Sequence, residues 1–309
     1  MKKDNLTFQA SDDVQIFTYK WMPDNVSDLK AVVQIAHGMA EHAARYERFA
    51  EVLTKAGYAV YANDHRGHGK TAGSKDHVGY FADENGWGKV VDDLHTLTGI
   101  IKTDNPNKPF FLFGHSMGSF LSRNYSMLYG HELTGLILSG TGGDPGMTGK
   151  VGHCIAKIDA KLHGRKAKSE IMNKLTFGAF NKAFKPNRTE YDWLSRDNAE
   201  VDKYINDPFC GGVFTAGFFC DFLGGLAFIN QKENIAGIPK NLSIYLFSGA
   251  KDPVGGNTKG VTQAYHALKS ADISDVTLKF YADGRHEMLN EINREEVFAD
   301  IIAWLNKHV

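Results

Sequence analysis

The chain has 309 residues, with 35 Lys and Arg against 36 Asp and Glu, so its formal charge is −1. This length suits one large α/β domain with an insertion, or two small domains. The balanced charge provides no overall attraction to nucleic acid or to an anionic membrane, so we expect no nucleic-acid partner.

The N-terminus and the cysteines predict a cytoplasmic protein. Basic residues open the chain without the apolar run of a signal peptide, and no later stretch approaches the roughly 20 apolar residues of a membrane span. Cys154, Cys210 and Cys220 are odd in number and lack the Cys-x-x-Cys spacing of zinc or redox sites. We therefore expect a reducing compartment and no metal site. None of these features indicates an oligomeric state.

Apolar patterning predicts a sheet edge followed by alternating strands and helices. Residues 5–21 alternate polar and apolar side chains around Ser11-Asp12-Asp13, which is typical of a hairpin. Strand-like runs follow at 31–36, 58–62, 110–113, 133–138, 242–247 and 276–280, and helical patterns at 46–56, 87–102, 117–129, 262–270 and 295–307. This alternation indicates a mostly parallel central sheet with helices on both faces.

The alternation fails between about Gly143 and Asn230, where the sequence becomes helical, basic at first and aromatic afterwards. An insertion above the sheet explains this change. We therefore expect a core of residues 1–142 and 231–309, with a helical cap at 143–230.

A nucleophile motif follows the apolar run 110–113. Gly114-His115-Ser116-Met117-Gly118 has the pattern Gly-x-Ser-x-Gly and precedes a helical stretch. In this strand–turn–helix context the pattern is typical of the nucleophile elbow of the α/β-hydrolase fold. The small residues let the backbone turn sharply, so that the serine hydroxyl projects at a helix N-terminus. We predict that Ser116 is the nucleophile.

An acid and a histidine follow in the order that this fold uses. Asp252 comes just after the strand-like run 242–247, and His286 comes just after the run 276–280. An imidazole can take the serine proton and return it to the leaving group, while a buried carboxylate fixes its tautomer. We assign Asp252 and His286 to these roles. The alternative acids are Asp221, Asp275 and Asp283, none of which matches both the strand end and the order as well.

The run 31–36 ends in His37-Gly38-Met39, at the place where this fold supplies an oxyanion amide. The expected donors are the backbone N–H groups of Met39 and Met117. We expect His37 and Gly38 to shape the loop.

Two further patterns are interpreted as scaffold. Asp64-His65-Arg66-Gly67-His68-Gly69 has metal-ligand residue types but no matching cluster elsewhere, and Gly140-Thr141-Gly142-Gly143 lacks the spacing and helix of a dinucleotide fingerprint.

Together with His37-Gly38-Met39-Ala40-Glu41-His42 and Arg45-Tyr46, these motifs resemble the monoacylglycerol lipase and lysophospholipase group of serine hydrolases over nearly the whole chain. The resemblance implies hydrolysis of a single acyl ester on a glycerol-like head group, with a cap shaping the acyl channel and no cofactor. In that group a small residue usually follows His-Gly, and Met39 replaces it here, which would narrow the alcohol end of the site.

Our functional hypothesis is hydrolysis of a lipid monoester through an acyl-enzyme on Ser116. The alternatives are a hydrolase of another small ester, thioester or amide, and a binding protein that keeps the fold without turnover. The cap phenylalanines are expected to divide between a core of the cap and an acyl channel; they are Phe209, Phe214, Phe218, Phe219, Phe222 and Phe228. We expect the basic residues of the cap to form a solvated helix face or, alternatively, to contact a lipid surface transiently; they are Lys161, Arg165, Lys166 and Lys168.

Overall fold

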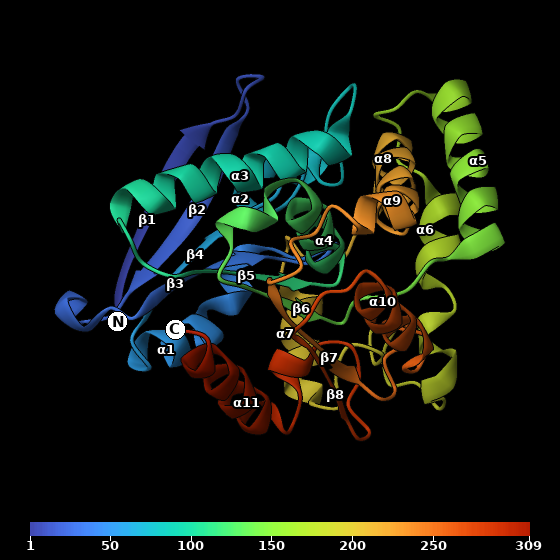
Figure 1. Cartoon of the computed structure of the whole chain (residues 1–309). Coiled ribbons are helices and arrows are strands. Elements are labelled where there is room, and N and C mark those ends of the chain that lie inside the picture. The colour runs from blue at the N-terminus through green and yellow to red at the C-terminus, as the bar shows by residue number, and fades with distance from the viewer.

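The computed structural model describes residues 1–309, apart from the side chain of Lys75, and in it eight strands form one sheet (Figure 1). The strands are β1 (Lys2–Gln9), β2 (Gln15–Met22), β3 (Ala31–Ala36), β4 (Tyr58–Asn63), β5 (Phe110–His115), β6 (Gly135–Ser139), β7 (Ser243–Gly249) and β8 (Val276–Tyr281). Their order is β1-β2-β4-β3-β5-β6-β7-β8; β2 is antiparallel to both of its neighbours, β1 and β4, and all other neighbouring strands are parallel. The predicted mostly parallel sheet with an edge hairpin is confirmed.

Helices cover both faces of this sheet. On one face lie α1 (Glu47–Lys55) and α11 (Arg294–Lys307). On the other lie α3 (Gly86–Asp104), α4 (Met117–Tyr129) and α10 (Lys259–Ser270), and α2 (Gly69–Ala72) and α9 (Lys232–Ile235) are short connecting helices. Because both faces are covered, β3, β4 and β5 are buried along their whole length and are mainly apolar; Gln34 in β3 is buried and donates a hydrogen bond to the Leu94 carbonyl.

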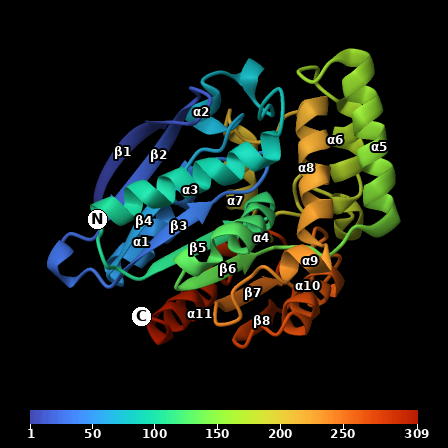
Figure 2. The same cartoon turned by 45° about the horizontal axis from the view of Figure 1, so that its top comes forward.

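Besides the short α9, four α-helices lie between β6 and β7 in the chain (Figures 1 and 2). They are α5 (Gly146–His163), α6 (Glu170–Phe177), α7 (Asn198–Asn206) and α8 (Ala216–Ile229). Thr215 caps α8 by accepting a hydrogen bond from the Phe218 amide. α8 lies between α5 on one side and α3 and α4 on the other, which explains why it is apolar all round.

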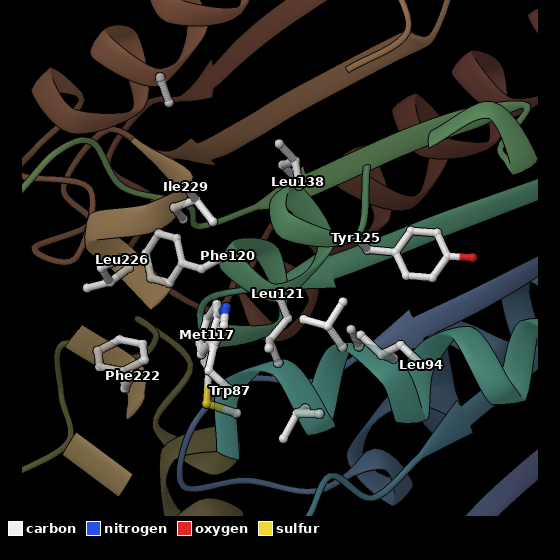
Figure 3. Close-up of a cluster of buried hydrophobic side chains, with 14 of the residues drawn as sticks. Trp87, Leu94, Met117, Phe120, Leu121, Tyr125, Leu138, Phe222, Leu226 and Ile229 are labelled. Carbon is white, nitrogen blue, oxygen red and sulfur yellow. The ribbon is translucent and has the colours of Figure 1, made fainter. Parts of the chain in front are cut away.

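The contact between α8 and the core is drawn in Figure 3. Trp87 from α3, Met117 and Phe120 from α4, and Phe222 and Leu226 from α8 meet in one buried cluster. The Trp87 indole donates a hydrogen bond of 2.8 Å to the Asn124 side chain, so its polar end is also satisfied. This cluster places α8 over the N-terminus of α4, next to Ser116.

No helix among the described residues combines the length and the apolar character that crossing a bilayer requires.

Candidate active site

Ser116 occupies a strained turn between β5 and α4. Its backbone has φ 50° and ψ −119°, a region that residues with a side chain rarely adopt. A Cβ on Gly114 would overlap the Gly118 carbonyl, and a Cβ on Gly118 would overlap the Ala36 carbonyl. Both glycines of the motif are therefore required sterically. The Ser116 side chain makes no helix-capping hydrogen bond, and Ser116 lines the large cavity described below.

His286 and Asp252 lie in direct contact in loops at the ends of β8 and β7. The His286 Nδ1–H points at both carboxylate oxygens of Asp252, each 3.0 Å away. The same carboxylate accepts hydrogen bonds from the Ser248 hydroxyl at 3.0 Å and the Val254 amide at 2.9 Å. Asp252 is fully buried, so its orientation is fixed from three sides and it fixes the His286 tautomer in turn.

The Asp252 carboxylate also sets the basicity of His286. Burial alone lowers the pKa of this imidazole, but the charge of Asp252 and its hydrogen bond outweigh burial, so the pKa is raised above 6.5. His286 and Ser116 line the same cavity. Among the described side chains, the Ser116 hydroxyl has no hydrogen bond to His286, and such bonds often tighten only when substrate binds.

Two backbone N–H groups are candidate oxyanion donors, those of Met39 and Met117. Met117 begins α4, where the first amides have no partner within the helix, and in the described chain neither its N–H nor that of Met39 has an acceptor. Both residues line the cavity. A Cβ on Gly38 would stand only 3.2 Å from the Ser116 Cβ, so glycine lets the loop of Met39 approach the serine.

His37 holds this loop in place. Its Nδ1–H donates to the Gly38 carbonyl at 2.7 Å, and its Nε2 accepts from the His65 amide at 2.9 Å. Burial, reinforced by neighbouring His65, keeps the pKa of His37 well below 6.5, so the ring stays neutral. The shaping role expected for His37 agrees with these contacts.

The segment 64–69 also makes scaffold contacts. The Asp64 carboxylate accepts from the Ala43 and Lys70 amides at 2.8 and 2.7 Å. Arg66 is buried and pairs with Asp93 and Asp12.

The competing carboxylates lie elsewhere. Asp275 accepts from His308 at 2.8 Å and from Ser243 at 3.0 Å. Asp221 pairs with Arg165 at 2.7 Å, and Asp283 has φ 57° in the turn after β8. Within the described side chains, the carboxylate of this set that contacts His286 is thus Asp252.

Sequence reasoning missed a buried ionic network behind the histidine. Arg45 pairs with Glu41 at 2.6 Å and with Glu287 at 2.7 Å, and Glu41 accepts the Gly38 amide at 2.7 Å. Burial opposes ionisation of Glu41, but the Arg45 charge and several hydrogen bonds keep its pKa below its usual value. Glu41 and Arg45 entered only as parts of a family pattern, and the position of Glu287 beside His286 was the one available signal.

Gly140 is a second missed residue. A Cβ there would lie 3.0 Å from His286 Cε1, and its φ is 57°. Only glycine leaves the space in which the imidazole sits.

The cavity above Ser116 has a volume of about 1220 Å³. Its apolar lining comes from α4, α5, α6 and α8 and from the segment between α6 and α8; the aromatic members are Phe120, Phe177, Phe180, Tyr191, Trp193, Tyr204 and Phe222. The Trp193 and His286 rings are 5.2 Å apart. Such a volume accommodates a ligand larger than a short ester.

The phenylalanines of residues 143–230 divide between the cavity wall and buried packing contacts. Phe222 lines the cavity, whereas Phe214 and Phe218 pack with His68 and Phe81 beneath α8. Phe219 is also buried, and Phe228 is 37% exposed. The reason is that α8 is enclosed by α5 and the core, so most of its rings fill contacts between helices.

Three of the four basic cap residues have partners. Arg165 pairs with Asp221, Lys166 lies 3.6 Å from Asp83, and Lys168 donates to the Val78 carbonyl. Lys166 and Lys168 thereby connect the helices between β6 and β7 to the core, a role that the sequence did not indicate.

Comparison with known proteins places this geometry in a family. The family described as serine aminopeptidase, S33, matches residues 27–293. A monoacylglycerol lipase of Mycolicibacterium smegmatis is 30% identical over 98% of this chain and 97% of its own. The chain belongs to the monoacylglycerol lipase-like α/β-hydrolases.

Further relatives agree with this membership. The monoglyceride lipase of Rattus norvegicus is 27% identical over 97% of this α/β-hydrolase and 89% of its own length. The solved structure of a thermostable carboxyl esterase from Bacillus coagulans, in complex with glycerol, superposes with a TM-score of 0.92 at 30% identity and covers 100% of both chains. The predicted fold class and the prediction of a serine hydrolase are confirmed.

Proposed function

We propose that this enzyme hydrolyses lipid monoesters, namely monoacylglycerols or lysophospholipids, through an acyl-enzyme on Ser116. The observation that carries the proposal is that Ser116, His286 and the residues Met39 and Met117, whose amides have no acceptor, line one large apolar cavity, with His286 hydrogen-bonded to Asp252. The names of the relatives support the same substrate class.

The proposed mechanism assigns one role to each group. The Ser116 hydroxyl attacks the ester carbonyl while His286 Nε2 accepts its proton, and the Met39 and Met117 amides stabilise the oxyanion. The imidazolium, stabilised by Asp252, then protonates the departing alcohol. A water molecule activated by His286 attacks the acyl-enzyme and releases the fatty acid. No cofactor takes part in these steps.

The size and apolar lining of the cavity favour a substrate with a long acyl chain. Each CH₂ that moves from water into an apolar channel gains roughly 0.8 kcal/mol. We therefore expect kcat/KM to rise with acyl length until the cavity is full. The alternative is hydrolysis of a small ester, thioester or amide by the same triad, which has no such dependence.

We further propose that residues 143–230 form a cap that contacts a lipid surface. Met147, Val151, Ile158 and Leu162 recur at helical spacing along α5, and the first and last are 71% and 72% exposed. Exposed lysines lie beside them, among them Lys161. An apolar stripe flanked by lysines is typical of a helix lying at a membrane interface. The three unpaired cysteines support the reducing cytoplasm as the location.

The central test measures kcat/KM on monoacylglycerols and lysophospholipids of increasing acyl length, beside acetyl esters and thioesters. Ser116→Ala should lose both turnover and labelling by a fluorophosphonate probe, whereas the exposed Ser270→Ala should keep both. Best activity on acetyl esters would favour the small-ester alternative, and wild-type protein that resists the probe would favour a binding protein.

A matched pair tests the acyl channel. Phe222→Leu changes the cavity wall and should shift the preferred chain length, whereas Phe228→Leu lies outside the cavity and should not. If Phe222→Leu kept the wild-type preference for acyl length, the acyl channel would not lie against α8.

A second pair tests the lipid surface. Leu162→Asp should reduce co-sedimentation with phosphatidylcholine vesicles, and Leu128→Asp, on exposed α4 surface, should not. Equal binding of both variants would contradict the proposed surface.

A further inference from the structure

One cluster of metal-ligand side chains lies outside the catalytic groups. His42 lies in the loop 37–42 that follows β3 and carries Met39, which we call the oxyanion loop. Asp207 and Cys210 follow α7 in the segment that leads to α8. One ligand atom from each residue lies within 4.8 Å of the others, and this is the one cluster of its kind among the described residues. The His42 Nε2 is 2.9 Å from an Asp207 oxygen.

We propose that His42, Asp207 and Cys210 form a zinc-binding site that joins the oxyanion loop to the segment between α7 and α8. Imidazole, carboxylate and thiolate are all zinc ligands, and a thiolate with an imidazole disfavours calcium or magnesium. Zinc bonds of roughly 2.0–2.3 Å place tetrahedral ligand atoms about 3.5 Å apart. Metal binding would require side-chain rotations that bring the ligand atoms, now between 2.9 Å and at most 4.8 Å apart, to this separation, and water would complete the fourth position.

The segment that carries two of the ligands is locally ordered. The other Asp207 carboxylate oxygen accepts the Phe209 amide at 2.9 Å, and the Cys210 amide donates to the Asp207 carbonyl at 3.1 Å. These bonds hold the two residues on one side of a turn. His42 is buried and its ring packs against that of Phe209, so the third ligand is also positioned before a metal binds.

Charge and access both suit a divalent cation. Binding releases the thiol proton to solvent, after which one carboxylate and one thiolate balance the two charges of Zn²⁺. Arg45 lies nearby, but Glu41 and Glu287 already neutralise its charge. Asp207 also lines an open groove with Asn206 and Pro208, which provides a path from solvent.

The position of the cluster links it to the oxyanion loop. The Ala40 carbonyl accepts hydrogen bonds from the Gly211 amide and the Tyr204 hydroxyl, both at 2.9 Å. A bound Zn²⁺ would add a cross-link at His42, two residues further along the same loop. Occupancy of this site would therefore stabilise the contact between that loop and the 204–211 segment.

Cobalt titration of the full-length protein tests the site directly, because tetrahedral Co²⁺ bound by a thiolate gives a near-ultraviolet charge-transfer band and visible d–d bands. The wild type should show these bands with one equivalent of Co²⁺, and Zn²⁺ should displace them. Cys210→Ser should lose the charge-transfer band, and Asp207→Asn should weaken binding at least tenfold.

Cys154→Ser, which changes an exposed thiol, is the matched control and should keep the bands. Retention of the charge-transfer band in Cys210→Ser, its loss in Cys154→Ser, or the absence of bands in the wild type would each overturn the proposal. Circular dichroism of each variant confirms that a lost band reflects a lost ligand and not a lost fold. These readouts are independent of esterase activity.

Discussion

Arg45 and Glu287 form a bidentate ion pair, with Nη1–Oε1 and Nη2–Oε2 distances of 2.7 Å, across 242 residues of sequence. The same guanidinium donates to Glu41, which accepts the Gly38 amide. Arg45 therefore connects the loop that carries Met39 to the loop that carries His286. Both carboxylates are buried, and Arg45 is the cation that pairs with each of them.

Replacing Arg45 should damage stability and turnover together. Arg45→Met leaves two buried carboxylates without a cation, which costs about 3–5 kcal/mol of unfolding free energy. The two loops lose their common anchor, so kcat should fall more than KM rises. Urea unfolding and steady-state kinetics check both effects, with the more exposed Arg48→Met as the control. A variant with wild-type stability and kcat would show that the network does not position these loops.

Asp252→Asn should cripple catalysis while preserving the fold. The amide keeps the shape of the side chain but cannot stabilise the imidazolium, and in a serine protease the corresponding change lowers kcat by about 10⁴. Asp275→Asn, which alters a carboxylate near the C-terminus, should keep nearly full activity. Should the Asp275 variant be the inactive one, the assignment of the acid would be wrong.

The pH dependence of kcat/KM should report His286. Only the neutral imidazole accepts the serine proton, so activity rises with pH through the pKa of His286, which lies above 6.5. In Asp252→Asn the raising influence is removed and burial remains, so the midpoint of the residual activity should move to lower pH. A midpoint that stays in place would mean that another group controls the acid limb.

Arg123 should control the mobility of the proposed cap. This buried residue of α4 donates to the Gly142 carbonyl at 2.9 Å and to Asn230 at 2.9 Å, the two ends of the insertion. Among the described contacts no carboxylate pairs with the Arg123 guanidinium, and burial lowers the pKa of Arg123 to about 10.

We expect Arg123→Met to raise amide hydrogen exchange across residues 143–230 while the exchange of β3 and β5 stays slow. Arg188→Met, an exposed change within the same insertion, is the control. If the two variants had equal amide hydrogen exchange across residues 143–230, Arg123 would not control the mobility of the proposed cap.

Local stereochemistry explains which features the sequence predicted. The elbow was recognisable because its short pattern, Gly-x-Ser-x-Gly between a strand and a helix, lies within one continuous segment; Gly114 is required by contact with Gly118, and Gly118 by contact with Ala36 of the neighbouring strand β3. Most strand ranges followed from mainly apolar runs, since a sheet covered on both faces leaves few polar positions to interrupt them, and the helix ranges followed from the helical spacing of apolar residues. The loop positions of Asp252 and His286 followed from the strands before them.

The missed features depend on segments that meet only in the folded chain. Arg45 and Glu287 are far apart in sequence, and no pattern within either segment identifies the other. The same holds for Gly140 beside His286 and for His42 beside Cys210. Composition shows that α8 is apolar but not which neighbour covers each of its faces, so the sequence could not assign single phenylalanines to the cavity or to packing contacts.

The enclosure of α8 has a consequence for the construction of chimeric enzymes. A Cβ on Gly225 would overlap the Trp87 indole, so the helix and the core are matched at the level of single atoms. Excising residues 143–230 would expose Trp87 and Phe120, and a transplanted insertion would carry apolar surface without its partner. This insertion is therefore not an interchangeable module: exchange between relatives must include the outer faces of α3 and α4, or the recombinant protein will aggregate.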